Sequence, residues 1–424
     1  MQSKQINKHE ILNFIQEETD IILPLSNGEP TVLLDLLEEE FKQLKGVKVH
    51  QILALKERNY MYGKYKEHLE HISYFLSPAT RKAFQKGGCR FVPCHFHQMP
   101  TVLKQTTKKP LVMAVASPID ENGYFTLGTQ ADYVSSMIGN VPFILEVNKQ
   151  MPQTFGENKI HINQVTAYIE VDYPLSELTP APISELDKQV AGHMIEYIEN
   201  GSTLQIGIGG IPNAVMSFLK QHRNLGVHTE MITDGIVELS KLGVIDGLNK
   251  NNYKGKIVGT FAYGTKNLYD FIHKNESIWL LGVDKTNDPR IIAQEDNIVS
   301  INATTEIDFY GQCASETIGG KLYSGTGGQV DFVTGSRFAK NGKSFICMPS
   351  TAKGGTISRI QPRLIPNSIV TTSKNDVDYV VTEFGIAELK YKSLDERAKE
   401  LIRIAHPQFR DQLRFEAKQN GFIL

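Results

Sequence analysis

Uninterrupted apolar runs, separated by segments with helical periodicity, constrain the fold of this chain more than any other feature. Leu111–Ala116 is a continuous apolar run, and Val47–Leu55 also has the composition of a strand. Ahead of Val47, apolar residues at helical spacing predict a helix that opens at Gly28–Pro30 and stops at Gly46. Strands that are apolar throughout are buried on both faces, as in parallel sheets covered by helices. The sequence therefore predicts an α/β protein with mainly parallel sheets.

The proline-rich segment Tyr173–Pro182 marks the predicted domain boundary. It holds three prolines within nine residues, which suppress regular structure. A chain of 424 residues is long enough for two domains of ordinary size, each with its own core. We predict domains at residues 1–183 and 184–424, the second opening with a helix that begins at Ser184 or Asp187.

Two further elements are predicted near the carboxyl terminus. Val377–Thr382 has the composition of a strand, and we expect it to lead into a helix from Ile386. Ser393 and Glu396 have the spacing of a capping box for the last long helix, which Pro407 is expected to close. Both halves of the chain are therefore expected to be α/β.

Composition excludes several classes of partner. The chain is 41% apolar and 22% charged with a formal net charge of −2, which gives no electrostatic reason to expect nucleic acid or an acidic membrane as partner. Met1–Lys8 lacks the apolar stretch of a signal peptide, and no run approaches the roughly 20 apolar residues that span a bilayer. Only four cysteines occur, which fits a reducing compartment. We expect a soluble cytoplasmic protein.

The first of two glycine-rich turns, Gly207–Pro212, is a candidate ligand-binding loop between the predicted strand Thr203–Ile206 and a helix. Glycines let backbone N–H groups approach a ligand, and a helix amino terminus favours an anion such as a phosphate. A tight βα turn without a ligand fits the segment equally well. The third glycine of a dinucleotide fingerprint would fall on Pro212, and no Gly-Lys-Ser/Thr follows as in a P-loop. These departures disfavour a nicotinamide oxidoreductase.

The second glycine-rich turn, Ser324–Phe332, packs three glycines into four residues. Such a loop can offer N–H donors to a developing oxyanion, although a strained connection packed against the core is the alternative. Between the two turns in sequence lies Glu230, within Gly226–Met231. A carboxylate beside backbone suited to a phosphorylated ligand indicates acyl chemistry on a bulky cofactor.

These segments together resemble the acetyl-CoA hydrolase/transferase family, especially its 4-hydroxybutyrate or butyrate:acetate CoA-transferase branch. Family members carry a His-Thr/Ser-Glu-Met element like His228–Met231, followed by Asp-Gly as at Asp234-Gly235. The resemblance spans nearly the whole chain, from Gly28–Pro30 through Ser117–Tyr124 to Ile404–Pro407. It implies two CoA-transferase-type α/β domains with the active site in their cleft, coenzyme A as co-substrate without a tightly bound cofactor, and a homodimer or higher homo-oligomer.

In this family the glutamate that corresponds to Glu230 is the nucleophile. Its attack on an acyl-CoA would give an acyl-glutamyl anhydride, and the CoA thiolate would then form a glutamyl-CoA thioester that an incoming carboxylate resolves. Neither ATP nor a metal is required. Because an exposed glutamate with a pKa of about 4.3 is a poor nucleophile, the protein must partly desolvate Glu230 and stabilise an oxyanion. The acid can be of the acetate, propionate, butyrate or 4-hydroxybutyrate type.

Glu383 is a rival nucleophile. Thr382–Gly385 has the hydroxyl-Glu-x-Gly pattern that other class I CoA-transferases use around theirs, and Glu230 lacks a glycine two residues on. In proteins resembling this chain, however, the element with Glu383 recurs beside the separate His-Thr-Glu element and looks structural. Glu383 therefore ranks second.

The resemblance also implies supporting residues. Asn287 aligns with an asparagine thought to donate to the oxyanion, and Gly328 aligns with a backbone donor. Lys353 could pair with a CoA phosphate, although an isolated lysine is more typically a solvated surface charge. The implied CoA contacts are Gly207, Ile208, Gly209, Gly210, Ile211, Asn302, Thr304, Gly327 and Lys353.

Cys89, Cys94, His95 and His97 are four potential zinc ligands within nine residues. There is no second ligand cluster in the sequence, because the two remaining cysteines stand alone. CoA transfer of this class needs no metal, so we expect none here and interpret the segment as a loop on the substrate side.

Two other functions fit the same residues. An acetyl-CoA hydrolase of the same fold would use water instead of a carboxylate to resolve the glutamyl-CoA, a difference set by how well the site excludes water. A non-catalytic CoA-binding protein would keep the loops and leave Glu230 unreactive.

Overall fold

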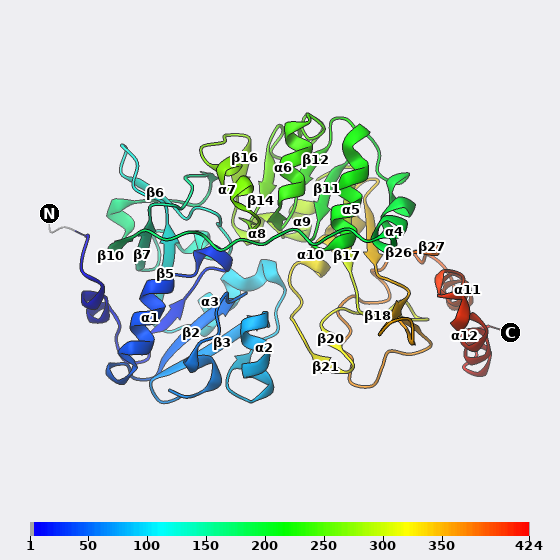
Figure 1. Cartoon of the computed structure of the whole chain (residues 1–424), viewed down its shortest axis with the longest axis horizontal. Coiled ribbons are helices and arrows are strands. Elements are labelled where there is room, and N and C mark those ends of the chain that lie inside the picture. The colour runs from blue at the N-terminus through cyan, green and yellow to red at the C-terminus, as the bar shows by residue number, and fades with distance from the viewer. Residues whose placement is uncertain (1–3, 424) are drawn as a thin grey trace. The chain divides into compact units, whose positions relative to one another are not determined.

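The structure, a computed structural model, describes residues 4–423 and divides into two compact units (Figure 1). The first unit contains the chain up to Leu178 together with Val258–Thr286, and the second contains Thr179–Ile257 together with the chain from Asn287 onward. The predicted domains, residues 1–183 and 184–424, are continuous in sequence, whereas the first unit of the structure also contains Val258–Thr286. The expectation for the amino terminus falls partly on residues 1–3, which lie outside the described residues.

The first unit is built on a sheet of seven parallel strands in the order β10-β7-β5-β1-β2-β3-β4. From β1, the chain adds strands first on one side and then on the other. The strands are β1 (Asp20–Ile22), β2 (Val47–Ile52), β3 (Leu69–Phe75), β4 (Arg90–Phe91), β5 (Pro110–Ala116), β7 (Phe143–Asn148) and β10 (Ala167–Val171).

Helices and short strands complete the first unit. The predicted helix before β2 is α1 (Thr31–Glu39), which ends before Gly46 because the chain tightens into a 3₁₀ turn at Phe41–Gln43. Leu33 and Leu37 on α1 are buried in the core, as its periodicity predicts. The other elements are α2 (Pro78–Gln85), α3 (Met99–Thr106), α7 (Lys266–Ile272), α8 (Val283–Thr286), β6 (Tyr124–Thr126), β8 (Phe155–Gly156), β9 (Lys159–His161), β15 (Phe261–Ala262) and β16 (Ile278–Leu280).

The second unit is built on strands in the order β27-β26-β22-β17-β11-β12, parallel except for β27. The chain starts at β11, adds β12 on one side, and later adds the remaining strands on the other. The strands are β11 (Thr203–Ile206), β12 (Gly226–His228), β17 (Ile298–Ala303), β22 (Lys343–Cys347), β26 (Tyr379–Thr382) and β27 (Gly385–Glu388), and β14 (Ile257–Gly259) carries the chain out of this unit.

Helix α4 (Glu185–Ile195) opens the second unit, and its start settles which residue caps it. The Asp187 N–H donates to Ser184 Oγ at 3.2 Å, and the Ser184 N–H donates to Asp187 Oδ2 at 2.9 Å. Ser184 is therefore the N-cap. The other helices are α5 (Gly210–Phe218), α6 (Asp234–Lys241), α9 (Pro289–Ile292), α10 (Gln329–Phe338), α11 (Leu394–Ile404) and α12 (Pro407–Gln419).

Short strands make up the rest of the second unit. They are β13 (Met231–Ile232), β18 (Glu306–Asp308), β19 (Cys313–Ala314), β20 (Thr317–Ile318), β21 (Lys321–Leu322), β23 (Thr351–Ala352), β24 (Ile357–Ser358) and β25 (Ile360–Gln361). The predicted class, α/β with mainly parallel sheets, is confirmed. Among the described residues, no helix has the length and apolarity needed to cross a membrane.

Two predictions near the carboxyl terminus are wrong. Ile386 begins no helix, because Gly385 adopts a φ of +130° and turns the chain back as β27, antiparallel to β26. Pro407 does not close the last long helix. It lies in the first turn of α12, where a proline is tolerated, and α11 has already ended at Ile404.

We expect Ser184→Ala to lower the free energy of unfolding by about 1 kcal/mol, because the amide N–H of Asp187 loses its acceptor, Ser184 Oγ. Ser184→Thr keeps the hydroxyl and serves as the matched control. Urea unfolding followed by circular dichroism measures both variants. Equal midpoints for Ser184→Ala and the wild type would show that the cap contributes nothing.

Candidate active site

The carboxyl ends of three neighbouring parallel strands define one edge of the second unit. Strands β11, β12 and β17 end at Ile206, His228 and Ala303, and their parallel register brings these ends together. The loop from Gly207 and the side chain of Glu230 follow directly. The strand order reverses between β11 and β17, and open α/β sheets bind ligands at such a point, outside the carboxyl ends of the strands.

The first glycine-rich turn has the predicted strand–loop–helix form. Helix α5 begins at Gly210, and Gly209 has a φ of +121°, a conformation that favours glycine. The side chain of Ile208 is 56% exposed, and a Cβ added at Gly207 would meet no heavy atom within 4 Å. The loop therefore presents open backbone at the amino terminus of a helix. Its role in binding CoA stays a prediction.

The structure brings Glu230, Asn287 and Gly328 together from three separate segments. Asn287 Nδ2 donates to Glu230 Oε2 at 2.9 Å, and the backbone N–H of Gly328 donates to the same carboxylate. A Cβ at position 328 would lie 1.9 Å from Glu230 Oε2 and 2.3 Å from Asn287 Nδ2. Since the φ of Gly328 is −96°, an ordinary value, the carboxylate itself is what requires glycine here.

Burial dominates the electrostatics of Glu230. Desolvation raises the pKa of Glu230 to about 7, and the hydrogen bond from Asn287 opposes this. The negative charge of Asp331 raises the pKa further, while the N–H of Gly328 lowers it. A carboxylate whose charge is this poorly solvated is more nucleophilic than one in water.

Asp331 is a site residue that the sequence analysis did not assign. It is 1% exposed and lies in the first turn of α10, three residues after Gly328. Its position on the same turn as a predicted backbone donor is the signal that could have identified it.

Thr229 fixes the backbone next to Glu230. Its hydroxyl donates to the carbonyl oxygen of Ile206 at 3.2 Å and accepts from the Ile206 N–H at 3.4 Å. These bonds join the end of β12 to the end of β11, where the first glycine-rich turn begins. The predicted nucleophile and that turn are therefore coupled through one buried side chain.

Glu383 has a different environment. Its carboxylate accepts from the N–H of Ser350 at 2.8 Å and from Ser350 Oγ at 2.5 Å, so both oxygens are engaged in holding the loop after β22. It follows β26, which lies four strand spacings from β12, or about 19 Å at about 4.8 Å per spacing. Glu383 and Glu230 therefore do not share one reaction centre, and the contacts of Glu383 are those of a structural group.

The remaining predicted CoA contacts lie at different places along the same edge. Asn302 donates from Nδ2 to Gln205 Oε1 and to Ser300 Oγ, both at 3.0 Å. Thr304 is buried, and its hydroxyl bonds to backbone carbonyl oxygens within the fold. Gly327, with a φ of +56°, sets up the turn that presents Gly328.

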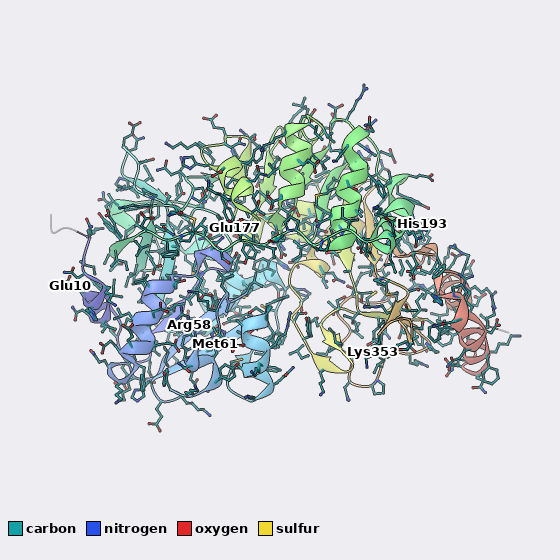
Figure 2. The ribbon with its side chains drawn as sticks, viewed as in Figure 1. Glu10, Arg58, Met61, Glu177, His193 and Lys353 are labelled. Atoms are coloured by element: carbon teal, nitrogen blue, oxygen red, sulfur yellow. The ribbon has the colours of Figure 1, made fainter. Side chains whose placement is uncertain are left out.

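Lys353 lies at the exposed tip of the hairpin between β23 and β24, labelled in Figure 2. It has a φ of +48°, and its carbonyl oxygen accepts from Thr356 Oγ1 at 2.9 Å. The hairpin follows β22, the strand next to β17, so Lys353 projects from the loops at the same edge of the sheet. Its pairing with a phosphate stays a prediction.

The side chains of Cys89, Cys94, His95 and His97 do not converge on one point. Cys89 is buried, and burial raises the pKa of its thiol to about 11. The sulfur of Cys94 lies 3.4 Å from that of Met99, and the rings of His95 and His97 stack at 5.8 Å. Within residues 4–423, no group of three or more His, Cys, Asp or Glu side chains is placed to hold a metal ion.

Two family models match the chain. The model of the acetyl-CoA hydrolase/transferase N-terminal domain matches residues 1–177, and that of the C-terminal domain matches residues 264–417. Glu230 and the first glycine-rich turn lie in the stretch between the two matches.

Similar proteins extend over nearly the whole chain. The chain is 44% identical to a succinyl-CoA:cyclohexane-1-carboxylate CoA transferase of Geobacter metallireducens, over 95% of this chain and 92% of that protein. It is 40% identical to a 4-hydroxybutyrate coenzyme A transferase of Clostridium kluyveri, over 98% and 97%. Among solved structures, RipA from Yersinia pestis matches with a TM-score of 0.93 at 35% identity, covering 99% of this chain and 98% of that one.

We expect Gly328→Ala to lower CoA-transfer activity by about 100-fold or more, because the new methyl group displaces the Glu230 carboxylate from its donors. The matched control is Gly192→Ala on helix α4, where an added Cβ meets no heavy atom within 4 Å. Steady-state kinetics and the unfolding temperature of both variants measure the effect. Wild-type activity in Gly328→Ala would show that the close approach is not needed.

Proposed function

Because the chain belongs to the acetyl-CoA hydrolase/transferase family and is a CoA-transferase, we propose that it moves CoA from a short-chain acyl-CoA to a free carboxylate through a thioester on Glu230. One observation carries the proposal. The Glu230 carboxylate is partly buried, has a pKa raised to about 7, and is held by the Asn287 amide and the Gly328 N–H.

The first half-reaction conserves the thioester energy. A Glu230 oxygen attacks the thioester carbonyl carbon, the C–S bond breaks, and an acyl-glutamyl anhydride and CoA thiolate form. The thiolate then attacks the glutamyl carbonyl carbon, and the acid leaves as its carboxylate. An incoming carboxylate reverses both steps on the glutamyl-CoA. No proton is transferred in the sequence, so no general acid is required.

Each attack places negative charge on a carbonyl oxygen. Asn287 Nδ2–H and the Gly328 N–H already point at the Glu230 carboxylate, and in the proposal they stabilise this charge. Desolvation of Glu230 raises the free energy of the resting carboxylate relative to the anhydride, in which the charge is gone. Binding energy from remote parts of CoA offsets the rest of the cost of the anhydride.

We place CoA along the carboxyl edge of the second unit's sheet. The reversal of strand order between β11 and β17 supports this, because Gly207–Ile211 and Asn302 follow these two strands. The amino terminus of α5 suits a phosphate or an amide of the pantetheine arm. Lys353 would supply a positive charge to a phosphate from the hairpin beyond β22, and Thr304 would act only through the backbone that it holds.

The relatives suggest a class of acid rather than one substrate. The two reported above act, by their names, on cyclohexane-1-carboxylate and on 4-hydroxybutyrate. We propose a monocarboxylate of the acetate, propionate, butyrate or 4-hydroxybutyrate type. The proposal includes a cytoplasmic homo-oligomer, and the low count of four cysteines in 424 residues supports a reducing compartment.

We expect incubation with acetyl-CoA, without an acceptor, to leave a covalent CoA adduct on the wild type and none on Glu230→Gln, because the amide is not a nucleophile. Intact-mass spectrometry detects the adduct, and peptide mapping locates it. Addition of acetate or butyrate should discharge it. Glu383→Gln is the matched control and should retain the adduct.

The other outcomes would each overturn part of the proposal. An adduct that persists in Glu230→Gln would move the nucleophile to Glu383 or elsewhere. Accumulation of free CoA without an adduct would favour a hydrolase. No adduct and no turnover would leave only a binding role.

We expect kcat/KM for acyl-CoA to rise as pH increases from about 6 to about 8, with a midpoint near the pKa of about 7 of Glu230. The sign follows from the nucleophile being the ionised form, whose fraction increases through its pKa. Asp331→Asn removes the like charge that raises this pKa and should shift the midpoint to lower pH. A flat profile over this range would mean that Glu230 titrates as an ordinary glutamate.

A further inference from the structure

Lys250 is a buried lysine that the reaction described above does not use. It is 4% exposed, and its ammonium group donates to the carbonyl oxygen of Val227 at 2.8 Å and to that of Lys256 at 3.0 Å. Burial lowers the pKa of Lys250 to about 8, although the negative charge of Glu295 opposes this. Burial of an ammonium group away from water costs free energy, so a buried lysine at this position requires an explanation.

The surroundings of Lys250 are built to hold it. Glu295 is fully buried and accepts from the N–H groups of Asn251 and Asn252 at 3.0 and 3.1 Å, which fixes the chain just after Lys250. A Cβ at Gly226 would lie 2.5 Å from Lys250 Cγ. The lysine stem therefore crosses β12 at the one position of that strand that has no side chain.

The contact partner of Lys250 belongs to the strand that carries the nucleophile. Val227 is the middle residue of the three-residue strand β12, three positions before Glu230. On its other side, the end of β12 is tied to β11 by the hydroxyl of Thr229. The short strand is therefore held from both sides, by one hydroxyl and one ammonium group.

We propose that Lys250 is a positioning residue for Glu230: its ammonium group fixes the backbone of β12, so that the carboxylate meets Asn287, Gly328 and the thioester carbon in the reactive geometry. This inference rests on the proposed function, because it assumes that Glu230 is the nucleophile. Lys250 acts through the backbone, since the groups that set the pKa of Glu230 are its burial, Asn287, Asp331 and Gly328. Displacement of a reacting group by about 1 Å can cost about 100-fold in rate.

The test compares Lys250→Met, which keeps the apolar stem and removes the donors, with Lys254→Met on the exposed part of the same loop. We expect Lys250→Met to lower kcat by about 10-fold or more, with KM for acyl-CoA and for the carboxylate within about two-fold of the wild type. The rate of CoA-adduct formation should fall in parallel, and the midpoint of the pH profile should stay in place. Lys254→Met should match the wild type throughout.

A second variant covers the case in which Lys250→Met does not fold. Gly226→Ala leaves the ammonium group intact but displaces the lysine stem, so it should also lower kcat at constant KM. Wild-type kcat per folded molecule in Lys250→Met would overturn the proposal, as would a raised KM at unchanged kcat. In the event that Lys250→Met does not fold, the same results in Gly226→Ala would overturn it.

The adduct on the wild type, and its absence from Glu230→Gln, are measured in the same experiment. Failure of the proposed nucleophile is thereby separated from failure of the role given to Lys250.

Discussion

The candidate active site depends on one close approach, that of the Glu230 carboxylate to the backbone of Gly328. The oxygen lies where any other residue would have its Cβ, so the loop before α10 can carry only glycine at this point. Removal from water raises the free energy of the charge, and two N–H donors compensate only in part. The site is thus an unfavourable arrangement in isolation, kept in place by the sheet beneath it.

The sheet provides that support through its strand order. The carboxyl ends of parallel strands lie at one edge of the sheet. The strand order reverses between β11 and β17, so the loops that follow these two strands diverge and leave space between them. Thr229 then ties the end of β12 to the end of β11, where the glycine-rich turn begins, while Ser350 and Glu383 tie down the loop after β22. Regular hydrogen bonding sets the positions of the chain ends, and a few buried side chains set the remaining geometry.

The elements that the sequence predicts correctly are those with a local signal, either a continuous apolar run or the spacing of a helix cap. Thr203–Ile206 forms the strand expected of it, and Ser184 caps α4, because burial and capping leave local signals. The hairpin at Gly385 is missed, since a single left-handed glycine reverses the chain within a segment whose composition also fits a helix. The burial of Lys250 and Asp331 cannot be inferred locally, because charged residues are usually exposed, and the Val227 carbonyl that Lys250 contacts and the Glu230 charge near Asp331 belong to other segments.

The excursion of Val258–Thr286 into the first unit has a consequence for the modularity of the protein. The chain returns at Asn287, the residue that holds the Glu230 carboxylate. A gene divided after residue 178 would give an amino-terminal product without α7, α8, β15 and β16. Its carboxyl-terminal product would carry those elements as an insertion between Ile257 and Asn287. A single cut in the sequence therefore cannot separate the two units, because the first is built from two stretches of the chain.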